Sequence, residues 1–340
     1  MNRKISIILA AHDQAEYIGN CLDSLLTQTI RDIEILAVDC GSTDGTGDIL
    51  YEDAHEDERV VFLADRRGSI GHAKNLGLDR ARTPYIMIPE PEDCLHKDVL
   101  ERLCRELDQN PDLGLAACGT EWVGTDAYGR TREDRMRILR EANQKDNRQQ
   151  EINSRLLRSW SFTYTTVYRR DFLEMHGIRH FEEPGYGRQD SAFRLLAMMK
   201  GAFFISEETG CERRVDRRTD RITDPRSVTD ICSEFRFLRE RLMEEDALWN
   251  RERFIFWQAF YDRNLLLYEE LADTLKPRLA GRMQAELKGA IEHREFDPYH
   301  FDAAVRPDME LLISDAKKFD QKQRERLKER EHACRETARA

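Results

Sequence analysis

The sequence predicts an α/β fold in which a mostly parallel sheet is flanked by helices and followed by an α-helical C-terminal region. In the N-terminal part, short apolar runs that suit buried strands alternate with amphipathic stretches, and the links between them are short. From residue 230 onward, apolar residues recur at helical spacing. Because parallel strands are joined by crossover helices, the alternation indicates helices on both faces of the sheet.

Four apolar segments are the expected first strands, and each of them runs into a polar turn. They are residues 5–11, 33–38, 60–63 and 85–88. A helix is expected to begin near Asp13, as its cap, and to end near residue 28. Further along the chain we expect a helix over 98–107, strands over 113–118 and 160–168, an exposed segment or mobile lid over 130–155, and a helix after Asp190.

Composition excludes several classes of protein. The formal net charge of −11 argues against a general nucleic-acid binder. No apolar run approaches the roughly 20 residues that a membrane-spanning helix needs. The 8 cysteines are scattered, without the close spacing of a zinc or redox motif, and indicate reduced thiols in a cytoplasmic protein.

Polar side chains gather after each of the first four strands. Because ligands of such sheets bind at the carboxyl ends of parallel strands, these loops are expected to converge on one site. The loop over 68–77 contains glycines and Lys74, which suit a phosphate group, although an ordinary turn has the same composition. The convergent residues are His12, Asp13, Asp39, Cys40, Gly68, Gly71, Lys74 and Glu90.

Two groups of acids are candidates for chemistry. Glu90, Glu92 and Asp93 follow the fourth strand, and such oxygen ligands suit Mg²⁺ or Mn²⁺ holding a diphosphate. The alternative is a solvated acidic turn before a helix that Asp93 caps. Asp190 precedes an apolar helix and acts either as its cap or as a general base.

Several motifs occur in the order found in family 2 glycosyltransferases of the GT-A fold, and the chain resembles that family over roughly residues 4–220. The resembling segments are 5–13, 21–29, 39–45, 68–77, Glu90-Pro91-Glu92 in the place of a DxD motif, 167–171, and Gln189-Asp190 in the place of a Glu-Asp pair. The resemblance implies a GT-A domain over residues 1–222, followed by a helical region over 223–340.

The resemblance also implies a role for each site residue. Glu92, with Glu90 or Asp93, would hold Mn²⁺ or Mg²⁺, and Asp190 would be the catalytic base. The nucleotide-sugar contacts would be Ala10, His12, Asp13, Asp39, Cys40, Gly68, Gly71, Lys74 and Glu90.

Several ligand groups depart from the family pattern. Cys40 stands in place of an aspartate, glutamates stand at 90 and 92 in place of aspartates, and Lys74 replaces an arginine. Lysine is a point charge, whereas arginine offers a bidentate fork. These departures leave open a catalytically silent relative that binds a nucleotide or a partner protein as a scaffold.

The family likeness implies an inverting transfer from a nucleotide-sugar, in particular a UDP-sugar. The acceptor would be a glycan or a lipid-linked saccharide in surface-polysaccharide synthesis. The enzyme would then work in the cytoplasm, with peripheral association at the inner face of the membrane as an option. The C-terminal helices are candidates for shaping the acceptor site or for forming a homodimer.

Overall fold

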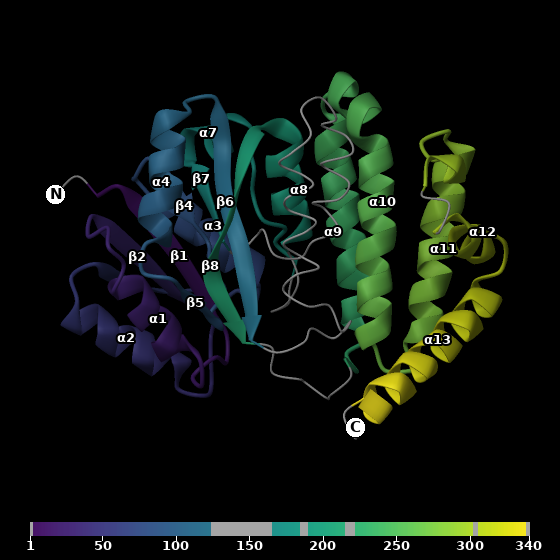
Figure 1. Cartoon of the computed structure of the whole chain (residues 1–340), viewed down its shortest axis with the longest axis horizontal. Coiled ribbons are helices and arrows are strands. Elements are labelled where there is room, and N and C mark those ends of the chain that lie inside the picture. Colours follow the sequence, from purple (N-terminus) through teal and green to yellow (C-terminus); the bar gives the residue numbers. More distant parts are fainter. Residues whose placement is uncertain (1–2, 124–164, 184–189, 215–221, 302–304, 338–340) are drawn as a thin grey trace. The chain divides into compact units, whose positions relative to one another are not determined.

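A computed structural model of the chain describes residues 3–123, 165–183, 190–214, 222–301 and 305–337. The chain divides into two compact units, Met1–Arg217 and Arg218–Ala340 (Figure 1). The predicted lid over 130–155, residues 160–164 of a predicted strand, and Gln189 lie outside the described residues.

The first unit is built on a sheet whose described strands number eight, in the order β3-β2-β1-β4-β7-β6-β8-β5. Strands β1 to β4 run parallel to one another, β6 and β8 are parallel, and β7 and β5 pair antiparallel with their neighbours. The strands are β1 (Ile5–Ala11), β2 (Ile33–Asp39), β3 (Val60–Ala64), β4 (Tyr85–Met87), β5 (Asp93–Leu95), β6 (Leu113–Val123), β7 (Thr166–Arg169) and β8 (Ala202–Arg214).

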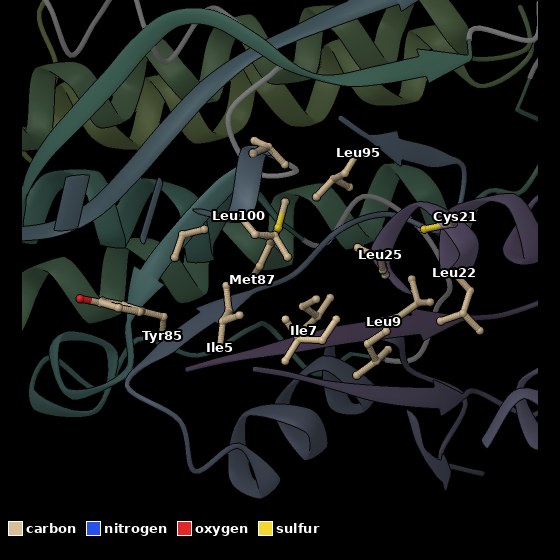
Figure 2. Packing of buried hydrophobic residues seen from close by; sticks show 14 of the residues in the cluster. Ile5, Ile7, Leu9, Cys21, Leu22, Leu25, Tyr85, Met87, Leu95 and Leu100 are labelled. Atoms are coloured by element: carbon tan, nitrogen blue, oxygen red, sulfur yellow. The ribbon is translucent and has the colours of Figure 1, made fainter. Parts of the chain in front are cut away.

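Helices cover both faces of this sheet, as the alternation of apolar runs predicts. Figure 2 shows Leu22 and Leu25 of α1 in the same buried cluster as Ile7 and Leu9 of β1. The helices of the first unit are α1 (Ile18–Leu26), α2 (Thr46–Glu56), α3 (Ile70–Arg80), α4 (Val99–Gln109), α7 (Arg170–Met175) and α8 (Ser191–Lys200).

Helix α3 packs closely on the face of β1 opposite to α1. A Cβ atom at Gly77 would come within 2.3 Å of Ile8 Cγ2, so no larger side chain fits there without a shift. A small apolar group from this side of the sheet also includes Ala10, Cys40 and Ala73. The close approach matters for function, because α3 carries Lys74 and Asn75 on adjacent positions.

The structure confirms the α/β fold class and corrects three local expectations. Asp13 does not cap a helix, since α1 begins at Ile18 with Tyr17 at its N-cap. Asp93 does not cap one either, because it starts strand β5, which pairs with β8. Helix α1 ends at Leu26, two positions before the predicted end.

The described part of the second unit is helical, as predicted. Its aromatic side chains form a core between helices, with the rings of Phe235 and Phe260 5.4 Å apart. No helix among the described residues is long and apolar enough to cross a membrane. The elements are α9 (Arg226–Met243), α10 (Asp246–Glu270), α11 (Lys276–Glu292), the 3₁₀ helix η2 (Pro298–His300), α12 (Arg306–Ser314) and α13 (Ala316–Thr337).

Candidate active site

The loops that follow β1, β2, β3 and β4 open at one edge of the sheet, because these strands run parallel. The predicted site residues of the first half of the chain are distributed over these loops and the first turns of α3. Two groups of side chains at this edge differ in what holds them.

The first group consists of the β1–α1 and β2–α2 loops, which are hydrogen-bonded to each other. The Asp13 carboxylate accepts the backbone N–H of Thr43 at 2.7 Å, and the N–H of Asp13 donates to Ser42 Oγ at 3.1 Å. Asp13 itself has a φ of +50°, in a region that aspartate tolerates better than most residues. His12 lies alongside, with Nε2 3.3 Å from Asp13 Oδ2. The Asp13 side chain therefore links the two loops.

Asp39 is the last residue of β2 and Cys40 follows it, and their side chains have different surroundings. The Asp39 carboxylate accepts the backbone N–H groups of Gly41 and Ser42 at 3.3 and 3.2 Å. Cys40 is buried, and burial together with the charges of Asp65 and Asp39 raises the pKa of its thiol to about 12. Its side chain packs in the same apolar group as Ala10. Any contact of Ala10 or Cys40 with a ligand would thus come mainly from the backbone.

The β3–α3 loop contains a histidine–carboxylate pair that the sequence did not indicate. The buried carboxylate of Asp65 lies 2.7 Å from Nδ1 of His72 and accepts the N–H of Arg67 at 3.1 Å. Gly68 adopts a φ of +70°, which glycine allows without strain. Gly71 lies in the first turn of α3, where backbone N–H groups favour an anion.

The second group surrounds Lys74, whose side chain is buried between two acids. Its Nζ lies 2.7 Å from Glu90 Oε1 and 2.8 Å from Asp190 Oδ1. Only 2% of the lysine is exposed. A buried ammonium needs partners to offset its desolvation, so this contact ties α3, the loop after β4 and the start of α8 together. Glu90 and Asp190, which are distant in the sequence, thus contact the same ammonium group.

The two acids on Lys74 differ in their affinity for a proton. Burial raises the pKa of Glu90 to about 7, opposed by Lys74 and assisted by the charges of Asp190 and Glu92. Burial would also raise the pKa of Asp190, but Lys74 and His180 outweigh it and hold that pKa below its ordinary value. Asp190 therefore remains ionised at neutral pH, while Glu90 is the acid that takes up a proton.

Asp190 occupies the N-cap position of α8, yet its side chain makes no capping hydrogen bond. It turns to Lys74 and to His180, whose Nδ1 lies 3.3 Å from Asp190 Oδ1. His180 carried no sequence signal. The backbone of His180 forms two hydrogen bonds with the side chain of Asn75, the neighbour of Lys74. The Asn75 amide donates to the His180 carbonyl and accepts the His180 N–H, each at 2.9 Å.

The three acids predicted to bind a metal lie in different environments. Glu90 is engaged by Lys74, Asp93 is fully buried in β5, and Glu92 is half-buried between them in the sequence. Among the described residues, no group of three or more His, Cys, Asp or Glu side chains could hold a metal ion. A Mg²⁺ or Mn²⁺ ion on a diphosphate needs only one or two carboxylates, because phosphate oxygens and water complete its shell. Glu92, which is half-buried, offers one such carboxylate.

Comparison with protein families matches residues 6–175 to the model described as Glycosyl transferase family 2. Among similar proteins, the uncharacterized glycosyltransferase EpsJ of Bacillus subtilis is 29% identical over 195 residues, which cover 57% of this chain and 55% of EpsJ. Chondroitin synthase of Escherichia coli is 38% identical over 126 residues, covering 37% of this chain and 18% of that enzyme. The matches thus span about half or less of these relatives.

Solved structures of TarS from S. aureus share the fold. TarS 1–349 has a TM-score of 0.68 at 16% identity, with coverage of 95% of this chain and 91% of TarS. The same fragment solved with UDP-GlcNAc gives a TM-score of 0.70, covering 95% and 92%. At this identity the likeness concerns the fold alone, and it agrees with the GT-A architecture expected from the sequence motifs.

Proposed function

Because this chain belongs to glycosyl transferase family 2, we propose that it moves a sugar from a nucleotide-sugar, in particular a UDP-sugar, to a hydroxyl group with inversion. The acceptor is a glycan or a lipid-linked saccharide of surface-polysaccharide synthesis. The observation that carries the proposal is the contact of Lys74 with Asp190 at 2.8 Å and with Glu90 at 2.7 Å. Asp190, the proposed base, shares this lysine with Glu90 of the loop that follows β4, and that contact supports the proposal.

Asp190 is the proposed general base. A base must be ionised to accept a proton, and Lys74 and His180 keep Asp190 in that form despite its burial. The closest contacts of both neighbours are with Oδ1. Oδ2 is therefore the oxygen that we propose accepts the proton of the attacking hydroxyl. Attack opposite to the departing diphosphate in one displacement would invert the anomeric carbon.

The donor is proposed to lie along the loops of β1, β2 and β3. The β1–α1 and β2–α2 loops, fixed by Asp13, would hold the nucleoside, and the N-terminus of α3 would face the diphosphate. TarS, which shares the fold, has been solved with UDP and with UDP-GlcNAc. Those complexes make UDP-sugars the first donors to test.

Glu92 is the carboxylate proposed to hold a divalent ion, Mn²⁺ or Mg²⁺. Such an ion supplies positive charge that stabilises the departing diphosphate. Glu90, paired with Lys74, would act on the donor and not on the ion. We also propose that transfer takes place in the cytoplasm, at the inner membrane face where the acceptor is lipid-linked.

The test begins with thermal shifts of the protein against UDP-glucose, UDP-galactose, UDP-GlcNAc and UDP-glucuronate, with and without Mn²⁺. We expect one of them to raise the unfolding temperature, and UDP release from it to depend on Mn²⁺. Glu92→Gln should weaken the Mn²⁺ dependence, whereas Glu52→Gln, at an exposed position on α2, should not. Absence of any nucleotide effect at millimolar concentration would reject the proposal.

A scaffold without turnover is the second candidate, and one observation favours it. The ion pair with Lys74 lowers the pKa of Asp190 and so weakens it as a base. Binding of UDP with a thermal shift but no release of UDP from any donor, with or without Mn²⁺, would select this scaffold.

A further inference from the structure

We propose that His180 is a positioning residue for Asp190, fixing the direction in which the carboxylate presents its second oxygen. The inference rests on the proposed function, since it assigns a task to a neighbour of the proposed base. It stands on the juxtaposition of a fully buried imidazole with Asp190 Oδ1 at 3.3 Å.

The ring of His180 is held by the helix that Asp190 begins. It stacks on Phe193 of α8 with ring centroids 4.1 Å apart and planes inclined by 4°. Phe193 in turn packs edge-on against Tyr168 of β7 at 5.3 Å. Because Asp190 and Phe193 lie one turn apart on the same helix, the imidazole contacts α8 at both places.

The backbone of His180 is held by α3. The Asn75 side chain donates to the carbonyl of His180 and accepts its N–H, both at 2.9 Å, and it also donates to Glu182 Oε1 at 2.7 Å. Asn75 follows Lys74 directly, so adjacent residues of α3 hold both neighbours of the Asp190 carboxylate. A shift of α3 would move these neighbours together.

Lys74 alone is a poor orienting group for Asp190. Its ammonium is a point charge on a flexible stem, and it is shared with Glu90. It attracts the carboxylate without defining its rotation. The imidazole is planar, fully buried and stacked, so its Nδ1 edge lies at a fixed place 3.3 Å from Oδ1 and limits how the carboxylate can rotate. Because a carboxylate is planar, holding Oδ1 in place also determines where Oδ2 lies.

The alternative is that His180 only packs against Phe193. The variant His180→Phe distinguishes packing from positioning, because it keeps a flat ring for stacking and removes the nitrogen near Asp190. His180→Asn places an amide nitrogen close to the position of Nδ1, whereas His180→Gln places it near that of Nε2. His176→Phe is the matched control, because His176 also contacts a phenylalanine ring, Phe172 at 5.0 Å.

The experiment measures kcat and donor KM for UDP release from the UDP-sugar that the protein turns over. We expect His180→Phe to lower kcat by about 10- to 100-fold with donor KM unchanged, because misplacement of a reacting group has effects of that size. His180→Asn should recover more of kcat than His180→Gln, and His176→Phe should leave kcat unchanged. A kcat of His180→Phe equal to that of the wild type would overturn the proposal.

Failure of the proposed function is distinguishable from failure of this inference. If the wild type releases no UDP, the glycosyltransferase reaction is rejected, and crystal structures of the wild type and His180→Phe decide the positioning claim. We expect the Asp190 carboxylate to rotate or move by more than about 0.5 Å, the tolerance of a positioned group. A carboxylate that stays in place would refute the claim, and His180→Asn is crystallised instead if His180→Phe does not fold.

Discussion

The two halves of the candidate site, the loops after β1 and β2 and the buried group around Lys74, are held by different kinds of interaction. In the loops, exposed or half-buried side chains such as Asp13 accept backbone N–H groups of the adjacent loop. Around Lys74, which is buried, charged groups meet from α3, the loop after β4 and the start of α8; Asp190 is buried as well, and Glu90 is partly buried. These residues are separated by up to 116 positions in the sequence. Loss of one loop bond exposes a group to water, whereas loss of one buried charge leaves the others without compensation.

This difference predicts that Lys74→Met is the most destabilising single change in the site. The methionine fills a similar volume, but Glu90 and Asp190 lose their cation in a buried place. Breaking a buried ion pair in this way costs about 3–5 kcal/mol. Urea unfolding at neutral pH measures the loss, with Lys97→Met, at an exposed position, as the control. A loss as small as that of the control would show that the Lys74 group behaves like a surface ion pair.

A smaller effect on the free energy of unfolding is expected when the pH changes, because Glu90 titrates. The folded-state pKa of Glu90, about 7, is above its ordinary value of 4.5, so the folded protein binds this proton more tightly than the unfolded chain. The resulting stability is fully present below pH 4.5 and is lost as the pH rises to 7. Between pH 5 and 8 we expect the wild type to lose on the order of 1–3 kcal/mol relative to Glu90→Gln.

Parallel urea titrations of both proteins across that pH range check the Glu90 prediction. The comparison with Glu90→Gln removes the contribution of the other titrating groups, which both proteins share. Equal pH slopes for wild type and variant would mean that Glu90 is not shielded from water in the folded protein.

The smallest loss of stability is expected from substitutions in the β1–α1 and β2–α2 loops. Asp13→Ala removes the acceptor of the Thr43 N–H and puts alanine at a φ of +50°, so we expect a loss of about 1–2 kcal/mol. Asp13→Asn keeps an acceptor oxygen and a residue tolerant of that conformation, and should be nearly neutral. Thermal unfolding of both variants measures the contrast. Equal losses would indicate that the charge of Asp13, and not its hydrogen bond, holds the loops.

The difference between local contacts and tertiary contacts also explains how much the sequence could predict. Strand β1 and the core face of α1 follow from local apolar spacing, and the first four strands were expected close to where they lie. The sequence placed Cys40 and Ala10 among the ligand contacts, but their side chains are in the core. A motif identifies a loop, whereas the direction of each side chain depends on what packs beneath it.

The Lys74 group was only partly predictable, because its members meet through tertiary structure. The sequence predicts that Lys74 contacts a phosphate group and that Asp190 is a candidate base, but no spacing in it indicates that these two side chains form an ion pair. His180 and Asp65 carried no signal, since a lone histidine or acid in a loop has no periodicity to interpret. Asn75 is buried in the middle of α3, and its side chain joins α3 to the backbone of His180, which only the structure shows.

The measurement that tests the account most directly is UDP release by wild type and Asp190→Asn under identical conditions, with UDP binding followed in parallel by thermal shift. If Asp190 is the base, the variant still binds UDP, and its kcat falls by about 100-fold or more, the usual contribution of a general base. If the variant releases UDP as fast as the wild type, the carboxylate that Lys74 and His180 contact is not the catalytic group.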